Sequence, residues 1–151
     1  ELVKITKGLN LKILAYDQIR DKSFAVEHNI EYCDLSFLLR NSNFVSIHLD
    51  LNKKTQHFIG AKELSIMNPN TYIINTSRGE VVDEIALFQA LKNNHIAGAA
   101  IDVFETEPYT GPLKKLNNVV LTPHIAAYAK ETRDRMEQEA IQNIIRGLDA
   151  A

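Results

Sequence analysis

The sequence predicts a doubly wound α/β fold, in which helices cover both faces of a parallel sheet. Three observations support this prediction. Short apolar segments rich in β-branched residues alternate with segments of helical period along the chain. The apolar segments are hydrophobic throughout, which is typical of strands buried on both faces. Several of them end in an ionisable side chain, and a parallel sheet gathers such strand ends on one rim.

Composition and charge restrict the class of function. A chain of 151 residues is about one domain, and 45% hydrophobic with 24% charged residues is the composition of an ordinary soluble globular protein. The formal net charge of -2 provides no basic surface for nucleic acid or for an anionic membrane. No apolar segment approaches the ~18 residues of a membrane-spanning helix, and the first residues do not resemble a secretory signal. Without a surface for nucleic acid or a membrane, the expected ligand is a small molecule. The single Cys33 cannot form an internal disulfide, which fits a cytoplasmic protein. No metal-type spacing surrounds it, so no metal site is expected.

The first elements alternate as the fold requires. Residues 2–9 have a helical period without a capping residue before them, so they are expected to be the second half of a helix. Residues 12–17 form an apolar run that ends at Asp17 and predict a buried strand. A helix over residues 20–28 and a short strand over residues 29–33 are predicted next.

The following part of the chain predicts a helix, a strong strand and a short helix. Asp34 is a suitable N-cap, and residues 35–40 follow it with helical period. The apolar and β-branched residues 44–49 predict a strand. A short helix is predicted over residues 60–67, because the Asn-Pro-Asn segment 68–70 then ends it.

An arginine and a glycine between a strand and a helix form the segment around which the fold is expected to be organised. Residues 72–74 predict the strand, and Asp83 predicts the N-cap of a helix that runs to Asn94. Arg78 therefore lies on a strand-to-helix turn, at the carboxyl end of the strands, where ligands bind in open parallel sheets. Arg78 is a candidate for binding an anion, although an arginine on a surface loop would produce the same pattern.

The last third of the chain predicts two more strands and one long helix. Small residues in the segment 96–101 indicate a strand packed closely against a helix, and this strand ends at Asp102. Residues 119–121 predict the last strand, which is followed by the Thr-Pro-His segment 122–124. From residue 131 to residue 148 apolar side chains recur every four positions, which predicts an amphipathic helix.

Ionisable side chains follow four of the predicted strands. They are Asp17, Arg78, Asp102 and His124, with Glu107 close behind Asp102. Because a doubly wound sheet gathers its strand ends on one rim, these side chains can converge. Histidine has an ordinary pKa near neutrality, so His124 is the natural proton carrier. Glu107 could orient its ring, and Arg78 could bind a carboxylate through two parallel hydrogen bonds. The sequence therefore predicts an acid beside an anion-binding group.

Asp17 bears on the choice of cofactor. An acidic residue at the end of the second strand of a dinucleotide-binding fold accepts hydrogen bonds from the ribose diol and repels a 2'-phosphate, which favours NAD over NADP. The alternative is that Asp17 caps the following helix. Arg20 could soften the rejection of NADP by turning toward the ribose. His48 and His57 have no carboxylate at a suggestive spacing, which favours a structural or solvated role for both.

Four segments carry a family resemblance. They are residues 14–17, LAYD; residues 75–83, NTSRGEVVD; residues 98–108, GAAIDVFETEP; and residues 121–125, LTPHI. Over about residues 1–140 the chain resembles the NAD-binding domain of the D-isomer-specific 2-hydroxyacid dehydrogenases, and within that family it is most similar to the D-3-phosphoglycerate dehydrogenases. The resemblance implies a Rossmann-like fold, NAD as cofactor, and reversible hydride transfer to and from a D-2-hydroxy acid. It favours 3-phosphoglycerate as substrate, a role in serine biosynthesis, and a homodimer in the intact protein.

The resemblance also implies roles for individual residues. Arg78 matches the arginine that binds the substrate carboxylate and carbonyl, His124 matches the acid/base, and Glu107 matches the carboxylate paired with that histidine. Asp17 matches the ribose-binding acid, and Asp102 matches the group that holds the nicotinamide carboxamide. The residues expected to contact the cofactor are Asp17, His48, Leu49, Thr76, Ser77, Arg78, Asp102, His124, Ala126 and Ala127.

The sequence departs from the family pattern in three places. Ala126 and Ala127 follow Ile125 where relatives usually have a glycine first, and the added methyl could narrow the pocket beside the nicotinamide. Asp50 stands where many relatives have proline. The glycine-rich turn that holds the pyrophosphate and the strand before it are not found, so residues 1–151 are expected to be a partial dinucleotide-binding domain, truncated at its N-terminus and without the substrate domain.

Two alternatives to an enzyme stay open. Nucleotide-sensing corepressors reuse this fold and much of this motif set, so an NAD(H)-sensing binding module has the same signatures. The isolated residues 1–151 could also be an inert fragment of the enzyme, because the turn that would hold the pyrophosphate is missing.

Overall fold

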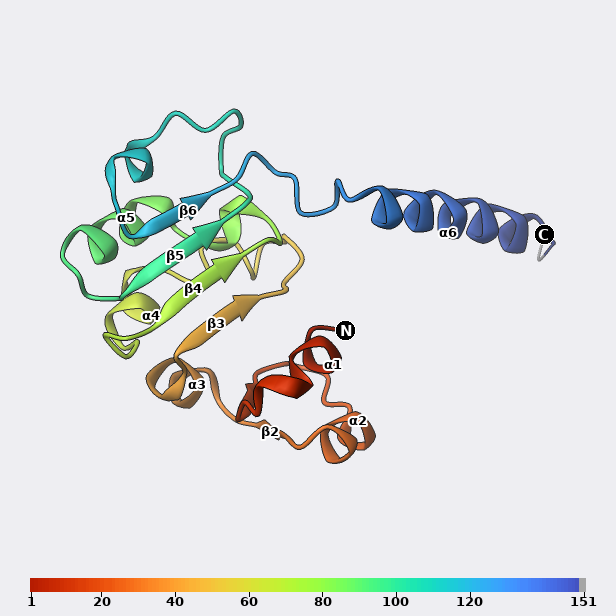
Figure 1. The fold of residues 1–151 in the computed structure, drawn as a ribbon, viewed down its shortest axis with the longest axis horizontal. Coiled ribbons are helices and arrows are strands. Elements are labelled where there is room, and N and C mark those ends of the chain that lie inside the picture. Colours follow the sequence, from red (N-terminus) through yellow and green to blue (C-terminus); the bar gives the residue numbers. More distant parts are fainter. Residues whose placement is uncertain (150–151) are drawn as a thin grey trace.

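The chain folds as a parallel α/β structure with two separate sheets (Figure 1). A computed structural model describes residues 1–149. The strands are β1 Ile13–Ala15, β2 Ile30–Tyr32, β3 Phe44–Ile47, β4 Tyr72–Asn75, β5 Gly98–Ile101 and β6 Val119–Leu121. β1 pairs in parallel with β2, and the larger sheet has the parallel order β3-β4-β5-β6. The predicted parallel α/β architecture is confirmed.

Helices connect the strands, and two of them begin at the predicted capping residues. The helical segments are α1 Leu2–Thr6, η1 Lys7–Leu9, α2 Lys22–Glu27, α3 Leu35–Asn41, α4 Ala61–Ser65, η2 Gly79–Val81, α5 Glu84–Lys92, η3 Pro112–Lys115 and α6 Lys130–Asp149. Asp34 and Asp83 cap α3 and α5, each by accepting hydrogen bonds from amides of the first helical turn. Helix α2 begins two residues later than predicted, because the side chain of Asp21 accepts the capping bond.

The hydrophobic core lies against one face of the larger sheet. Ile73 in β4 is fully buried, and it belongs to the same buried cluster as Leu64 of α4 and Leu87 and Leu91 of α5. Successive side chains of a strand point to opposite faces, so these helices bury every second residue of the strands. The core therefore holds the carboxyl ends of β4 and β5 in a fixed arrangement.

The opposite face of the larger sheet is open. The side chains of Phe44, Tyr72 and Val120 are 62%, 46% and 63% exposed. Phe44 and Tyr72 stack on each other across neighbouring strands, with ring centroids 5.7 Å apart. The sequence predicted helices on both faces, but within residues 1–149 both α4 and α5 pack in the core on one face.

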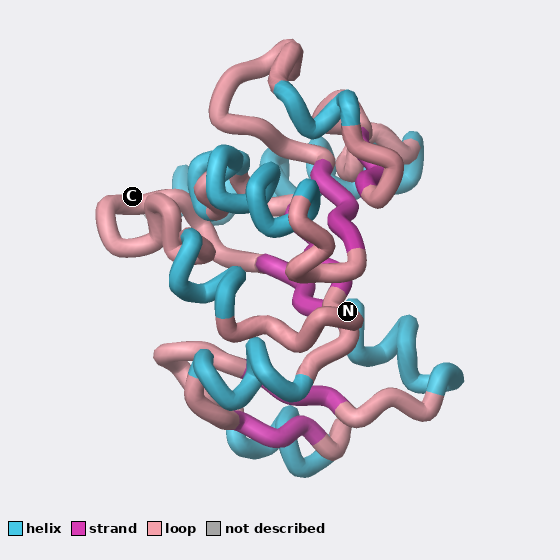
Figure 2. Tube along the Cα trace, turned by 90° about the vertical axis from the view of Figure 1, so that its left-hand side faces the viewer, coloured by secondary structure: helices cyan, strands magenta, loops and turns pink. Residues whose placement is uncertain are grey.

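The sheet is interrupted between β1 and β3 (Figure 2). Each of these two strands has a strand partner on one edge only within the described part of the chain. The common order of such sheets places one further strand between them, the strand that precedes the glycine-rich turn.

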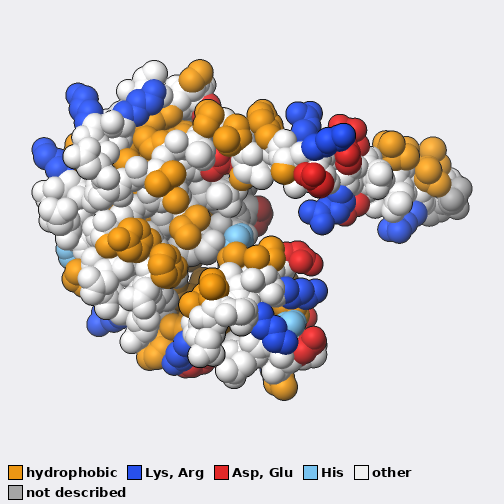
Figure 3. All heavy atoms as spheres, in the orientation of Figure 1, with side chains coloured by type: hydrophobic (Ala, Val, Ile, Leu, Met, Phe, Trp, Pro, Cys, Tyr) orange, Lys and Arg blue, Asp and Glu red, His pale blue; other side chains and the backbone are white. Residues whose placement is uncertain are grey.

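Helix α6 extends away from the rest of the molecule (Figures 1 and 3). The predicted apolar stripe is present and exposed along it: Met136, Ile141, Ile144, Ile145 and Leu148. Among residues 1–149 there is no helix with the length and hydrophobicity needed to cross a membrane.

Candidate active site

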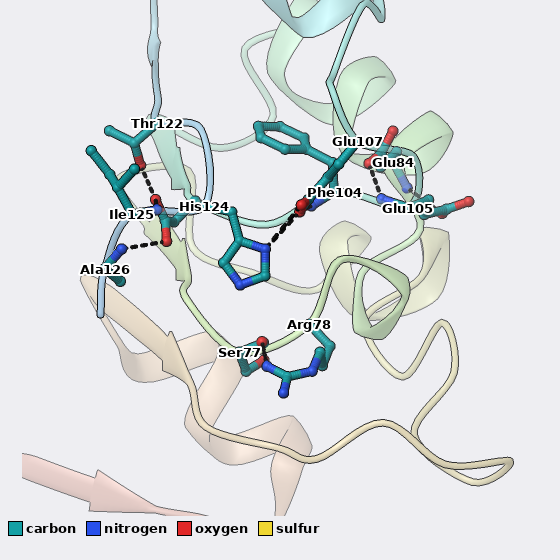
Figure 4. Close-up of polar contacts among 11 residues, drawn as sticks. Ser77, Arg78, Glu84, Phe104, Glu105, Glu107, Thr122, His124, Ile125 and Ala126 are labelled. Carbon is teal, nitrogen blue, oxygen red and sulfur yellow. Dashed lines mark hydrogen bonds and ion pairs between the residues drawn. The ribbon is translucent and has the colours of Figure 1, made fainter. Parts of the chain in front are cut away.

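Polar residues that follow three parallel strands lie at one edge of the larger sheet. Because β4, β5 and β6 run in parallel, the segments after their carboxyl ends come together there. Figure 4 shows the ring of His124 pointing toward the turn that carries Ser77 and Arg78, with Glu107 next to the ring. The structure thus brings Arg78, Glu107 and His124 together, as the sequence predicted for their positions.

A buried asparagine fixes the turn that carries Arg78. Asn75 is 1% exposed, and its side-chain Nδ2 donates to the carbonyl oxygen of Arg78 at 2.9 Å. Its Oδ1 accepts from the backbone N–H of Ser77 at 3.0 Å and from the Ser77 hydroxyl at 2.8 Å. Asn75 is a site residue that the sequence analysis does not identify. The sequence does contain an indication of this role, because Asn75 precedes Ser77 by two residues. At that spacing an asparagine side chain can accept a hydrogen bond from the backbone and close a turn.

The guanidinium of Arg78 lies at the surface of this turn. One nitrogen, Nη1, donates to the carbonyl oxygen of Ser77 at 2.6 Å. A guanidinium has five N–H donors, so four others are available for a ligand. Arg78 is exposed and makes no ion pair with the side chains of residues 1–148. It is therefore a cationic group that can receive an anion.

The residue after Arg78 is pressed against the loop that carries Glu107. A Cβ atom on Gly79 would lie 2.0 Å from the carbonyl carbon of Phe104 and 2.5 Å from the backbone nitrogen of Glu105. Only glycine fits this approach of two backbones. The position of Arg78 is thereby tied to that of the Glu107 loop.

His124 and Glu107 form a hydrogen-bonded pair. Nδ1 of His124 lies 2.9 Å from Oε2 and 3.1 Å from Oε1 of Glu107. The backbone N–H of Phe104 donates to Oε1 of Glu107 at 3.1 Å. These hydrogen bonds lower the pKa of Glu107, and the bond with His124 has the largest effect. The Glu107 carboxylate therefore stays ionised near neutral pH. Because a carboxylate only accepts, Nδ1 carries a proton and Nε2 is left for a substrate.

Asp102 anchors the loop on which His124 lies. The carboxylate of Asp102 is 4% exposed and accepts hydrogen bonds from the hydroxyl of Thr122 and from the amides of Ile125 and Ala126, the latter two at 2.9 Å. Burial acts to raise the pKa of Asp102, but these hydrogen bonds lower it overall. They hold His124 at a φ of 55°, a left-handed conformation that few side chains adopt. The predicted contact of Asp102 with a nicotinamide carboxamide stays a prediction, and Thr122 is a residue that sequence reasoning missed.

Asp17 lies at the end of β1, on the smaller sheet. One oxygen, Oδ1, accepts from the backbone N–H of Ile19 at 2.9 Å, and the side chain is exposed. The alternative that Asp17 caps α2 is wrong, since Asp21 caps that helix. The guanidinium of Arg20 lies over the ring of Tyr32, 5.7 Å from its centroid, so Arg20 has an aromatic partner of its own.

The other residues predicted to contact the cofactor follow β3, β4 and β6 at the same edge of the sheet. His48 is exposed, with Nε2 2.8 Å from the hydroxyl oxygen of Ser46. Leu49 and Ser77 are partly buried, whereas Thr76, Ala126 and Ala127 are exposed. Their contacts with a cofactor stay predictions.

The polar groups at these strand ends suit a dinucleotide ligand. Asp17 keeps Oδ2 without a hydrogen-bond partner in the described chain and can accept from a ribose diol. After β4 and β6 the exposed residues Thr76, Ala126 and Ala127 follow the strands at the same edge as Arg78 and His124. A parallel α/β fold with these groups at its strand ends is a dinucleotide-binding domain.

The chain belongs to the D-isomer specific 2-hydroxyacid dehydrogenase family, whose NAD binding domain matches residues 1–126. It is 48% identical over 145 residues to a glyoxylate reductase of Thermococcus litoralis, covering 95% of this chain and 44% of that protein. It is also 48% identical over 141 residues to a glyoxylate reductase of Korarchaeum cryptofilum, covering 92% of this chain and 42% of that protein. The chain thus spans less than half the length of these relatives.

Two solved structures have the same fold as this chain. The D-isomer specific 2-hydroxyacid dehydrogenase of Lactobacillus delbrueckii ssp. bulgaricus, in its NAD complexed form, superposes with a TM-score of 0.87 at 31% identity, over 99% of this chain and 49% of that one. An acyclic imino acid reductase in complex with NADPH and D-Arg gives a TM-score of 0.88 at 33% identity, over 99% of this chain and 47% of that one.

These comparisons confirm the predicted family and its Rossmann-like fold, and NAD is the cofactor named for the family's domain. They do not support the finer resemblance to D-3-phosphoglycerate dehydrogenases, because both relatives described above are named glyoxylate reductases.

Proposed function

We propose that residues 1–151 are the dinucleotide-binding domain of an NAD-dependent D-2-hydroxyacid dehydrogenase whose substrate domain lies elsewhere in the intact protein. The enzyme reduces a small 2-oxo acid to a D-2-hydroxy acid, and the reaction is reversible. The observation that carries this proposal is the His124–Glu107 pair, with Nδ1 and Oε2 2.9 Å apart, facing the turn of Arg78 (Figure 4). The family membership of the chain supports the same activity.

The proton in this reaction passes through His124. Glu107 accepts from Nδ1, which fixes the ring and leaves Nε2 pointing away from the carboxylate. A protonated His124 donates from Nε2 to the oxygen of the substrate carbonyl as that oxygen gains negative charge. In the reverse direction neutral His124 takes the proton from the hydroxyl group. The ionised Glu107 stabilises the charged form of the ring in both directions.

Arg78 binds and orients the substrate. Its free N–H donors can form two parallel hydrogen bonds to a carboxylate, or one to the carboxylate and one to the adjacent carbonyl oxygen. The hydrogen bonds of Asn75 hold its backbone in place. A 2-oxo acid has these two oxygen functions side by side, which is the arrangement that a guanidinium matches.

NADH bound at the strand ends would supply the hydride. The residues that would hold it are the predicted set, with Asp17 at the adenosine ribose and Thr76, Ser77 and Ala126 at the nicotinamide end. Asp17 favours NAD over NADP because its carboxylate repels a 2'-phosphate. Arg20 lies over Tyr32, which supports this preference.

Glyoxylate is the substrate that the names of the relatives favour. The alternative is 3-phosphoglycerate, in serine biosynthesis, which the sequence resemblance favoured. The ratio of kcat/KM for glyoxylate reduction to kcat/KM for 3-phosphoglycerate oxidation, measured on the intact enzyme at one pH, decides between the two. A ratio well above one supports a glyoxylate reductase, and a ratio well below one supports the phosphoglycerate reaction.

We further propose that the intact enzyme is a homodimer, as the family resemblance implies, and that it is cytoplasmic, which fits its lone Cys33. Light scattering coupled to size-exclusion chromatography measures the mass in solution. A mass of one subunit over the working concentration range contradicts the dimer.

Replacing His124 with alanine in the intact enzyme tests the activity. Turnover with NADH and saturating glyoxylate is expected to fall by about 10²-fold or more, because a positioned acid/base contributes at least that much. His95→Ala is the matched control, since His95 is exposed and its Nε2 contacts only the carbonyl oxygen of Ser65, 2.9 Å away. Near wild-type turnover of His124→Ala contradicts the assignment. Tight NADH binding without turnover of any 2-oxo acid supports the NAD(H)-sensing alternative instead.

A further inference from the structure

Two glutamates outside the site described above join helix α5 to the loop that carries Glu107 (Figure 4). The backbone N–H of Glu105 donates to Oε1 of Glu84 at 2.7 Å. In return the backbone N–H of Glu84 donates to Oε1 of Glu105 at 3.4 Å. Each side chain thus accepts from the backbone of the other residue, across 21 positions of sequence. We refer to these two residues as the Glu84–Glu105 pair.

A histidine adds a third member to this contact. Nε2 of His57 lies 3.0 Å from Oε1 of Glu105. The backbone N–H of His57 donates to the carbonyl oxygen of Glu80 at 2.7 Å, and Ile59 forms a parallel bridge with Val82. The segment that carries His57 is therefore fastened to the turn after Arg78. This contact could not be predicted from the spacing of the residues, because His57 and Glu105 are 48 positions apart.

The Glu84–Glu105 pair lies between the turn that carries Arg78 and the loop that carries Glu107. Glu105 directly follows Phe104, whose backbone N–H binds Oε1 of Glu107 at 3.1 Å. Gly79, directly after Arg78, packs against the backbone of the same two residues, Phe104 and Glu105. A displacement of residue 105 therefore changes both the hydrogen bond that holds Glu107 and the contact that positions Arg78.

The closeness of the Glu84 and Glu105 carboxylates would destabilise the folded protein if backbone amides did not donate hydrogen bonds to them. Burial raises the pKa of Glu84, and the nearby charge of Glu105 adds to that shift, while the hydrogen bond from the Glu105 amide opposes it. Two neighbouring carboxylates repel each other, so they stay together only because backbone N–H groups and His57 bind them.

We propose that Glu84 and Glu105 are positioning residues that set the placement of the Glu107–His124 pair relative to Arg78. The inference rests on the proposed function, because it assigns these residues to the same reaction. They contact neither of the groups proposed to touch the substrate, Arg78 and His124, and they act through the backbone of residues 104 and 105.

Glu84→Ala and Glu84→Gln in the intact enzyme test this inference with NADH and glyoxylate. Glu84→Ala removes the acceptor for the Glu105 amide and is expected to lower kcat by ~10-fold, because small misplacements of catalytic groups are expensive. Glu84→Gln keeps an acceptor oxygen at the same place and is expected to stay within about twofold of wild type. Glu80→Ala is the matched control, since the Glu80 carboxylate makes no hydrogen bond within residues 1–149. The dissociation constant of NADH is expected to be unchanged in all three.

The double variant Glu84→Ala, Glu105→Ala tests whether the two residues act as one unit. If they do, its kcat falls no further than that of the more damaged single variant. If the fold-losses in kcat of the two single variants multiply in the double variant, the two residues act independently, which contradicts their action as one unit. Unchanged kcat in Glu84→Ala, or equal losses in Glu84→Ala and Glu84→Gln, overturns the inference. Thermal unfolding followed by circular dichroism verifies that each variant is folded at the assay temperature.

A readout that does not depend on turnover separates this inference from the proposed function. The pKa of Glu107 is lowered by its hydrogen bonds from His124 and from the Phe104 amide, and carbon-13 NMR of its carboxyl group measures that pKa. In Glu84→Ala the pKa of Glu107 is expected to rise toward its ordinary value, and in Glu80→Ala it is expected to stay low. If the wild type turns over no 2-oxo acid but this shift occurs, the proposed function fails and the positioning role stands. If turnover is present and neither kcat nor this pKa changes, the positioning role fails alone.

Discussion

Replacing Gly79 with alanine is expected to disable the site without unfolding the protein. The added methyl carbon would lie 2.0 Å from the carbonyl carbon of Phe104 and 2.2 Å from its oxygen, whereas ordinary contact begins near 3.4 Å. The two backbones must therefore separate by about 1.4 Å, because neither atom belongs to a flexible side chain. Gly79 adjoins Arg78, and Phe104 binds Glu107, so the separation moves the anion-binding group away from the acid/base pair.

The size of the effect follows from this geometry. A misplacement of ~1 Å costs about 10²-fold in rate when catalytic groups must meet a substrate together. Overpacking of this kind also costs about 1–3 kcal/mol of stability, so most molecules stay folded if the intact enzyme has ordinary stability. We expect kcat with glyoxylate to fall by about 10²-fold, and we expect the melting temperature to fall by a few degrees.

Steady-state kinetics and calorimetry on the intact enzyme measure the two quantities. Gly147→Ala is the matched control, because within the described residues its added methyl group would meet no atom within 4 Å beyond the local backbone of its own helix. Activity of Gly79→Ala within about threefold of wild type, in a protein that melts normally, would show that the spacing between the Arg78 turn and residue 104 does not matter for the reaction.

Two further changes test other parts of the site. Asp102→Asn is expected to lower stability at neutral pH by about 2 kcal/mol, since charged hydrogen bonds from the Thr122 hydroxyl and two amides are weakened. The pKa of Asp102 is lowered in the folded state, so its contribution is present above the ordinary aspartate pKa and is lost as the pH falls through the folded value. Urea unfolding of both proteins should therefore give curves that converge toward acidic pH, and a constant gap contradicts this reasoning. In kcat/KM the wild type is expected to prefer NADH over NADPH by about 2 kcal/mol, and Asp17→Ala is expected to reduce that preference. An unchanged preference means that Asp17 does not contact the ribose.

Features of the site that depend on neighbours in sequence could be predicted from the sequence. Asp34 and Asp83 were expected to cap helices, and both do so through residues two or three positions further on. The strands were recognised from continuous apolar runs, and their parallel order then required Arg78, Asp102 and His124 to share one edge. Glu107 was expected near His124 because it closely follows Asp102 in the sequence, and the family resemblance implied the same pairing.

Features that depend on contacts between distant segments could not be predicted. His57 was expected to be structural or solvated, and no spacing in the sequence indicates that its ring lies 3.0 Å from a carboxylate 48 residues away. Asp102 was expected to bind a cofactor, and nothing near it in sequence showed that it accepts from residues 122, 125 and 126. The open face of the larger sheet was missed because apolar strands predict burial without showing which elements provide it.

The proposed role of the Glu107–His124 pair is the proton step, and Glu107 is not among the residues proposed to hold the cofactor. A single-turnover measurement tests it: the loss of NADH fluorescence is followed after saturating glyoxylate is mixed with the NADH-bound intact enzyme, in the wild type and in Glu107→Gln. Glutamine keeps the shape of the side chain but removes the charge that stabilises the protonated ring. The rate of NADH oxidation is predicted to fall by ~10²-fold while the dissociation constant of NADH stays the same. An unchanged rate, or a loss of NADH affinity that accounts for the whole effect, would contradict the claim.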